Sequence, residues 1–302
     1  MSEVGIITDS AACVPEELIG KYGIEIAPMI LINEGKAYRD RIDIASAEFY
    51  QSLSRDEILW TTSAPSPGSY LELFRKAADK FSQILVITMT PNLSHAYESA
   101  RAGVDISREE LSSLTIEVLD SGTAAGAQGL VVLAAARAAN RGETLSRVIA
   151  STRSLMSKVG LIAFLDTLSY LAKGGRVPQV AAWASSLLNI KPIIEVLPLS
   201  RGVRSLQRVR TRPGAIRRLE EIVKERVGRK PVHCIVMHSN FIDEAEELKE
   251  RMASELDCAE VYVTDFTPVM GVHTGPGLLG VAFYTDNEND MGDYHEENKC
   301  NR

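Results

Sequence analysis

The sequence contains little cysteine, and the cysteines it has are dispersed. Four cysteines occur among 302 residues, and no two of them form a CxxC pair. This usage is typical of a protein kept reduced in the cytoplasm, and it argues against a structural zinc site. HxH and HExxH patterns are absent as well, so the sequence gives no support to another kind of metal site.

Long apolar runs are also missing. No run reaches the roughly 18–20 residues that a membrane-spanning helix needs. The first residues, MSEVGIITDS, do not show the charged and then apolar order of a secretory signal. Hydrophobic residues make up 45% of the chain and charged residues 24%, the balance of a packed globular protein. We therefore expect a cytoplasmic protein of two domains, because one domain usually holds about 100–200 residues.

The net charge of −7 is unevenly distributed. Residues 286–302 contain six acids and two bases, which predicts an acidic, disordered tail. Residues 201–230 contain eleven bases and three acids. Such a segment is usually a solvated face; the alternative is a docking surface for an acidic partner or for the anionic headgroups of a membrane surface. Nothing in this balance points to nucleic acid.

The stretch Trp60–Gly68, WTTSAPSPG, is the first with chemical promise. Ser66 can cap the helix that follows, and Pro67 fits its first turn, where a missing N–H costs nothing. The loop thus collects hydroxyl groups and free backbone N–H groups at a positive helix end, which suits a carboxylate or phosphate. The alternative is an ordinary capped helix after a proline-rich turn.

In the first half, short apolar runs alternate with helical patterns. Val4–Thr8, Ile84–Met89 and Leu114–Leu119 read as strands, with Ile84–Met89 buried on both faces, and Ile24–Ile32 reads as a further strand with a hairpin return. This rhythm predicts an α/β fold with a mostly parallel sheet, whose ligand groups gather at the carboxyl ends of the strands. Three polar segments follow such strands: Thr8–Ser10, Thr90–Ser94 and Asp120–Thr123.

The second half repeats the alternation and predicts a second α/β domain. We place the domains at residues 1–158 and 159–285, with the ligand site between them and the tail beyond. The amphipathic helix predicted over Leu145–Val159 would join the two halves. Gln179–Leu188 reads as an apolar helix, and Val269–Gly280 reads as a glycine-dense loop.

Two glycine-rich segments carry side chains that could act on a ligand. His273 lies in HTGPG and Arg176 follows KGG, but neither segment is a GxGxxG fingerprint or a P-loop. Structural turns with incidental side chains remain the alternative for both. His95 follows Ser94 directly, yet neighbouring helical residues point about 100° apart, which argues against a catalytic pair. His233 and His238 lie at a strand and are expected to be packed.

Taken together, the motifs resemble the DegV family of bacterial fatty-acid-binding proteins. They occur in the family's order across nearly the whole chain, apart from the tail. FLDTLSYLAKGGRV and HTGPG are the most specific of them. The motifs are TDS (8–10), TTSAPSPG (61–68), NLSHAYESA (92–100), LDS (119–121), FLDTLSYLAKGGRV (164–177), IKPI (190–193), RVRT (208–211) and HTGPG (273–277).

The resemblance implies two α/β domains that hold a long-chain fatty acid and catalyse no reaction themselves, with no cofactor. It implies that Thr62 and Ser94 hold the carboxylate, with Ser63 and His273 beside them. It further implies a partner, a fatty acid kinase that phosphorylates the presented carboxyl group from ATP and so feeds phospholipid synthesis. Arg176 and His273 are then expected at the exposed end, where they couple the carrier to that partner.

Two other classes of function remain open at this stage. The hydroxyl loops could bind a phosphorylated metabolite and make the chain a small-molecule phosphotransferase or phosphatase. The missing P-loop, metal-ligand cluster and base for the serine stand against that reading. The other class is a regulatory module that senses a bound lipid. A retained fatty acid would support a carrier, whereas a retained nucleotide or sugar phosphate would support an enzyme.

Overall fold

The computed structural model describes residues 3–53, 60–177, 190–199 and 202–285. The first half contains a four-stranded sheet of order β2-β1-β6-β7 in which all neighbours are parallel, as the alternation of strands and helices predicts. Its strands are β1 (Val4–Asp9), β2 (Glu25–Ala27), β6 (Gln83–Thr88) and β7 (Thr115–Asp120). The chain therefore has the expected α/β fold.

Helices cover both faces of this parallel sheet, and β6 shows why. Ile84 and Val86 pack with Phe74 of α3 (Pro67–Ala78), while Leu85 and Ile87 lie on the opposite face, where α6 (Leu145–Met156) contacts the strand. Successive side chains of a strand point to opposite faces, so a strand covered on both sides has an uninterrupted apolar sequence. This half also contains α1 (Glu16–Tyr22), α4 (Ala96–Ser107) and α6 (Leu145–Met156), with a single turn η1 (Ser10–Ala12) after β1.

The second half forms a mixed sheet of order β10-β9-β8-β13-β11-β12, in which β11 and β12 are the parallel pair. One face is covered by α9 (Arg212–Val227) and α10 (Ile242–Glu255). The strands are β8 (Gly160–Phe164), β9 (Lys191–Leu197), β10 (Gly202–Val209), β11 (Val232–His238), β12 (Cys258–Asp265) and β13 (Leu279–Thr285).

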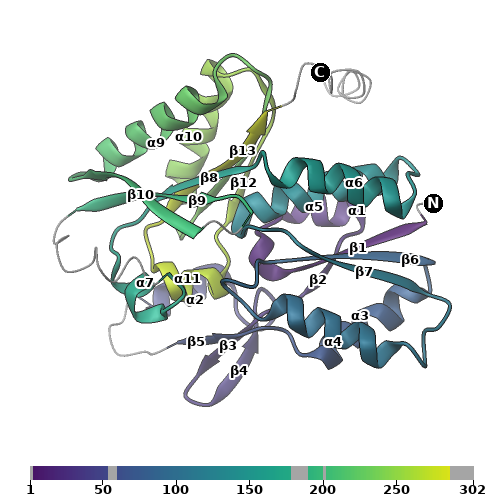
Figure 1. Cartoon of the computed structure of the whole chain (residues 1–302). Coiled ribbons are helices and arrows are strands. Elements are labelled where there is room, and N and C mark those ends of the chain that lie inside the picture. Colours follow the sequence, from purple (N-terminus) through teal and green to yellow (C-terminus); the bar gives the residue numbers. More distant parts are fainter. Residues whose placement is uncertain (1–2, 54–59, 178–189, 200–201, 286–302) are drawn as a thin grey trace.

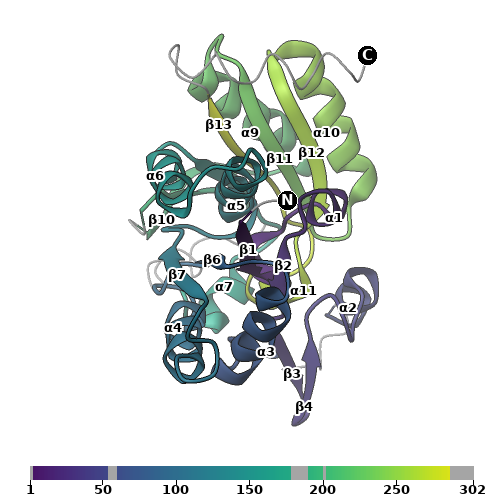
Figure 2. The same ribbon diagram turned by 90° about the vertical axis from the view of Figure 1, so that its right-hand side faces the viewer.

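The helix α5 (Ala125–Asn140) lies between the two sheets. It packs on β1 of the parallel sheet and on β11 and β13 of the mixed sheet, as Figures 1 and 2 both show. Fourteen of its sixteen residues are buried, which explains its apolar composition on all sides. One hydrophobic cluster consequently runs through both halves. The strands of each sheet stay on their own side of residue 158, and the boundary at 158/159 remains a prediction.

A small antiparallel sheet of order β4-β3-β5 lies beside these layers. It comprises β3 (Ile30–Asn33), β4 (Lys36–Arg39) and β5 (Thr61–Ser63), with α2 (Ser46–Leu53) following β4. The predicted hairpin return is confirmed, and both turn residues have positive φ, 48° at Glu34 and 77° at Gly35. The single strand predicted over Ile24–Ile32 is wrong. The segment divides into β2 and β3 at Pro28, which cannot donate to a ladder.

The prediction of a loop over Val269–Gly280 is also wrong. Its first part is helix α11 (Pro268–Thr274), which begins with a proline in the first turn, and its last residues belong to β13. The residues before Arg176 form a short helix, α7 (Ser169–Gly174), which is closed by Gly175 at φ 66°. The predicted helix 179–188 and the predicted tail 286–302 lie outside the described residues. Among the residues described, no helix is both long enough and apolar enough to cross a membrane.

Candidate functional site

A cavity of ≈ 580 Å³ lies between the parallel sheet, the small antiparallel sheet and the mixed sheet. Its wall has two chemical characters. Its polar lining supplies hydroxyl groups, an imidazole and a guanidinium, and aliphatic side chains make up most of the remainder. The polar lining includes Thr62, Ser63, Asn92, Ser94, Arg176 and His273; the apolar lining includes Met29, Met89, Leu161, Ala163, Ile194, Val196, Met237, Val269 and Leu278.

Thr62 reaches this cavity because it lies on a strand. It is the middle residue of β5 and pairs with Leu31 of β3, so its side chain alternates with those of its exposed neighbours Thr61 and Ser63. Its Oγ1 lies 2.8 Å from Nε2 of His273. These residues are 211 positions apart in the sequence. The contact joins the two halves of the chain at the polar end of the cavity.

The helix end singled out in the sequence is formed as predicted but does not reach the cavity. The Ser66 hydroxyl accepts a hydrogen bond from Ser69 N at 3.1 Å, and Pro67 begins α3. Within the described chain, the cavity lining takes Thr62–Ala64 from this stretch and leaves out Ser66, Pro67 and Gly68. The expectation of an anion at the start of α3 is therefore not supported by the geometry, whereas the hydroxyl groups before it do line the cavity.

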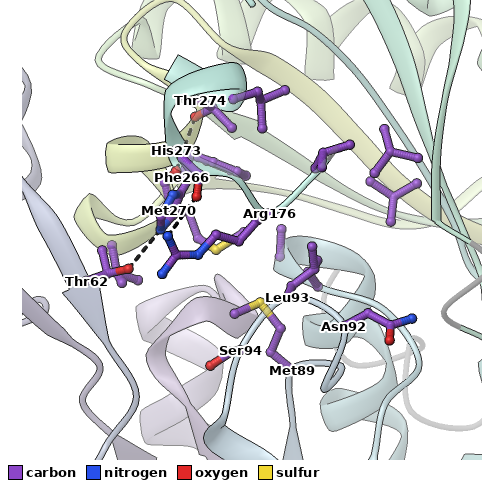
Figure 3. Close-up of a pocket in the computed structure, with 18 of the residues that line it drawn as sticks. Thr62, Met89, Asn92, Leu93, Ser94, Arg176, Phe266, Met270, His273 and Thr274 are labelled. Carbon is purple, nitrogen blue, oxygen red and sulfur yellow. Dashed lines mark hydrogen bonds between the residues drawn. The ribbon is translucent and has the colours of Figure 1, made fainter. Parts of the chain in front are cut away.

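Ser94 lies just before α4, in the second predicted hydroxyl loop. Backbone hydrogen bonds from Leu93 N and Ser94 N to Thr90 O, at 3.0 and 3.2 Å, shape this loop. The Ser94 hydroxyl accepts a hydrogen bond from Ala96 N at 3.2 Å, which leaves its own proton available to donate. Figure 3 shows Ser94 across the cavity from Thr62 and His273.

His273 lies in the last turn of α11, half-buried, and its position corrects the expectation of a surface side chain on a loop. Its Nδ1 is buried and has no hydrogen-bond partner among the described residues. Burial, and next the charge of Arg176, lower the pKa of His273 to about 4. The imidazole is therefore neutral near pH 7 and can exchange a hydrogen bond without carrying a fixed charge.

Arg176 supplies the positive charge at this end of the cavity. Its Nη1 donates to the carbonyl oxygen of Gly174 at 2.7 Å, and its side chain is exposed while also lining the cavity. Figure 3 shows its guanidinium beside Thr62 and His273. Of the predicted site residues, the structure thus brings Thr62, Ser63, Ser94, Arg176 and His273 to one cavity.

The TDS segment has a different place from the one expected for a ligand loop. Asp9 is fully buried and accepts a hydrogen bond from Met89 N at 2.7 Å. The Ser10 hydroxyl donates to Asp40 at 2.6 Å, and Asp40 accepts from Val269 N at 3.1 Å. Met89 and Val269 line the cavity, so the carboxyl groups of Asp9 and Asp40 support the backbone of the cavity wall.

Asp40 is a residue that the sequence did not reveal. It lies in a polar segment after a hairpin, and no local pattern shows that it reaches α11. Its side chain is 1% exposed, and burial raises the pKa values of Asp9 and Asp40 to about 6. Burying these two carboxyl groups costs free energy, and such groups are usually held in place by several hydrogen-bond partners.

Of the other histidines that the structure describes, His95 belongs to the cavity lining, whereas His233 and His238 do not. His95 is 92% exposed and its Nδ1 lies 3.9 Å from Glu98, in agreement with the argument against a Ser94–His95 pair. His233 and His238 are buried in β11, as predicted. No group of three metal-ligating side chains occurs in the described residues. In the basic segment, several side chains form ion pairs, which favours the solvated face: Arg204, Arg218, Lys224 and Arg226.

Comparisons with known proteins agree over nearly the whole chain. A family model described as "Uncharacterised protein, DegV family" matches residues 3–286. A DegV domain-containing protein of Clostridium perfringens is 32% identical over 281 residues, which cover 93% of this chain and 98% of that protein. One of Streptomyces coelicolor is 32% identical over 282 residues, covering 92% of this chain and 97% of the relative.

Solved structures show the same fold. The structure described as fatty acid binding of a DegV family protein from Thermus thermophilus has a TM-score of 0.84 at 27% identity, covering 95% of this chain and all of that one. A stearic acid-binding protein of Eubacterium ventriosum has a TM-score of 0.84 at 25% identity, covering 94% of this chain and 98% of its own. Since both the family model and these relatives span almost its full length, the chain belongs to the DegV family.

Proposed function

We propose that this chain binds a long-chain fatty acid in the ≈ 580 Å³ cavity, with the carboxylate at the polar end and the acyl chain along the apolar wall. The observation that carries the proposal is the division of the cavity wall. Thr62 and His273 share a hydrogen bond at one end, and aliphatic side chains from β8, β9 and β11 line another part. Relatives described as fatty-acid-binding support it.

The apolar wall accounts for the affinity. A sixteen-carbon acid buries about fourteen methylenes at roughly 0.8 kcal/mol each, about 11 kcal/mol before the costs of binding are subtracted. A ligand with a short or charged body would leave this wall in contact with water. The cavity also falls within the range of about 300–1,000 Å³ that is typical of small-molecule sites.

The polar end accounts for the orientation. A carboxylate cannot be buried without donors. In the proposed complex the hydroxyl groups of Thr62 and Ser94 donate to it, with Ser63 and His273 beside them. Because His273 is neutral near pH 7, these hydrogen bonds hold the carboxylate without a buried ion pair. The carboxylate oxygens then remain nucleophilic.

We further propose that the chain presents this carboxyl group and does not transform it. An ATP-dependent fatty acid kinase would phosphorylate the bound acid, and the acyl phosphate would feed phospholipid synthesis. The exposed guanidinium of Arg176 supports this part, because it lies where the cavity meets the surface and can offer paired donors to a phosphate. In this proposal Arg176 and His273 couple the carrier to the kinase.

Native mass spectrometry of freshly purified protein tests the binding. We expect a retained long-chain fatty acid that is removed by organic extraction and restored by adding palmitate or oleate. A retained nucleotide or sugar phosphate would contradict the proposal. Incubation with ATP, magnesium and palmitate should give no acyl phosphate or ADP from the chain alone. Steady turnover by the pure protein would make it an enzyme.

A further inference from the structure

The two motifs that contain Arg176 and His273 pack against one another along their length. They are 164–177, which contains α7, and 273–277, which ends α11; Figure 1 shows the two helices side by side. Contacts occur at three levels: Asp166 against Gly277, Tyr170 against Gly275, and Gly174 against His273. Each step of four residues forward along 164–177 corresponds to a step of two residues backward along 273–277, so the two segments run antiparallel.

Glycine is required where these segments touch. Gly275 and Gly277 have φ angles of 76° and 87°, and a Cβ at either would overlap Tyr170 or Asp166. A Cβ at Gly174 would lie 2.7 Å from Nδ1 of His273. The imidazole therefore rests directly on the backbone of α7, and its ring cannot move toward that helix.

One arginine locks the far end of this contact. Arg212, the first residue of α9, donates from Nη1 to the carbonyl oxygen of Gly277 at 2.7 Å and to Asp166 Oδ1 at 3.1 Å. It also pairs with Glu244 at 2.6 Å and stacks 4.0 Å from the ring centroid of Phe241. Its side chain is only 16% exposed. A planar, multiply bonded guanidinium in this setting has little freedom.

Asp166 receives a second cation, because Lys191 Nζ lies 2.9 Å from the same oxygen. The lock formed by Asp166, Arg212 and Lys191 therefore joins the loop after β8, the start of β9, the start of α9 and the segment after α11. His273 and Arg176 lie at the other end of the two packed segments. A displacement of Gly277 away from Asp166 would be transmitted through four residues to the His273–Thr62 hydrogen bond.

We propose that Asp166 and Arg212 are positioning residues for the polar end of the cavity. They hold the packed segments 164–177 and 273–277 together, so that His273 and Arg176 are in place before a carboxylate arrives. This inference rests on the proposed function, in which that end receives the carboxylate. Loss of the lock makes the ligand bear the cost of ordering two side chains, which corresponds to an affinity loss of about tenfold.

The test compares Asp166→Ala, Arg212→Ala and Arg212→Lys with the matched control Arg218→Ala. Arg218 is also on α9 and also pairs with acids, Glu221 and Glu225, but contacts neither packed segment within the described chain. Transfer of palmitate to albumin gives the dissociation rate, and palmitate labelled with ¹³C at the carboxyl carbon reports the environment of that group by NMR. Gly174→Ala, which alters no charge, displaces His273 directly and serves if an alanine variant fails to fold.

We expect the first two variants to release palmitate about tenfold faster and to shift or broaden the bound carboxyl signal. Arg212→Lys should lie between them and the wild type, Arg218→Ala should match the wild type, and Gly174→Ala should resemble Arg212→Ala. Folded Asp166→Ala and Arg212→Ala proteins with the wild-type carboxyl signal and release rate would overturn the inference.

A failure of the proposed function can be told apart from a failure of this inference. If the wild type binds no palmitate, the proposed function fails, and the ¹⁵N spectrum of the ligand-free His273 imidazole decides the inference. That signal is assigned from its absence in His273→Gln. A signal that differs between the wild type and Arg212→Ala supports the positioning role, and an identical signal refutes it.

Discussion

Two histidine sites connect the halves of this chain, and they differ in how completely their polar atoms are paired. At the first, His233 Nδ1 lies 2.7 Å from Glu260, and its ring stacks on Tyr284 at a centroid distance of 4.4 Å. Arg137 of α5 donates to the same carboxylate at 2.7 Å. At the second, His273 contacts Thr62 at 2.8 Å, and its Nδ1 is left without a partner among the described residues.

The electrostatics of the two sites differ in the same way. Burial by itself would raise the pKa of Glu260, but the hydrogen bond from His233 and the charge of Arg137 lower it to about 2. At His273, burial and the charge of Arg176 both disfavour the protonated form. Satisfied buried charges hold a structure together, whereas a neutral imidazole whose hydrogen bond is to a hydroxyl group of the cavity lining can contribute to ligand binding. The comparison therefore separates a structural site from the proposed binding site.

The largest expected effect is at the structural site. Glu260→Gln removes the charge that compensates Arg137, whose side chain is 8% exposed. We expect the free energy of unfolding to fall by about 3–5 kcal/mol, measured by urea denaturation, with palmitate affinity of the folded protein unchanged. The control is Glu143→Gln, which breaks the more exposed pair with Arg141 and should cost about 0.2–1 kcal/mol. Equal costs for both variants would contradict the structural assignment.

The next effect is at the binding site. Thr62→Val and Ser94→Ala each remove a donor to the proposed carboxylate, which should cost about 1.5–3 kcal/mol of binding, or roughly a tenfold or greater rise in Kd for palmitate. Thr61→Val changes the exposed neighbour on the same strand and should leave Kd unchanged. Titration with a fluorescent fatty acid measures all three. Full affinity in Thr62→Val and Ser94→Ala would remove both residues from the site.

The smallest effect is in the pH dependence of stability. The unfolded chain protonates His273 near pH 6.5, and the folded chain does so near pH 4, so acidification through this window lowers the free energy of unfolding. Asp9 and Asp40, with pKa values raised to about 6, act in the opposite direction between about pH 6 and 3.8. The slope of the wild type therefore combines opposing contributions.

Substitution of the histidine isolates its contribution. His273→Gln should lose less stability than the wild type as the pH falls from 6.5 to 4, measured by urea denaturation at a series of pH values. His95→Gln, a change at an exposed imidazole, is the control. Parallel curves for the wild type and His273→Gln would show that His273 is not kept neutral by burial.

Short-range patterns in the sequence determined most of the elements. The apolar run of β6, the Ser66 cap with Pro67 in the first turn of α3, and the Glu34-Gly35 hairpin all depend on residues within a few positions. Local sterics and hydrogen bonds decide such features, so the sequence is sufficient to predict them. The hydroxyl loops were found in the same way, because turn chemistry is also local.

Contacts between distant segments were decided by the tertiary structure alone. The Thr62–His273 hydrogen bond spans 211 positions, Val269 and Asp40 are 229 apart, and Arg212 meets Gly277 across 65. No periodicity in the sequence indicates such a pair, because only the folded structure brings the two partners together. For the same reason, the TDS segment was predicted as a ligand loop although it supports the cavity wall. The packing of α5 against two sheets likewise depends on contacts between distant segments. The sequence identified the polar side chains that could contact a ligand, and packing of the two halves determined which of them face a common cavity.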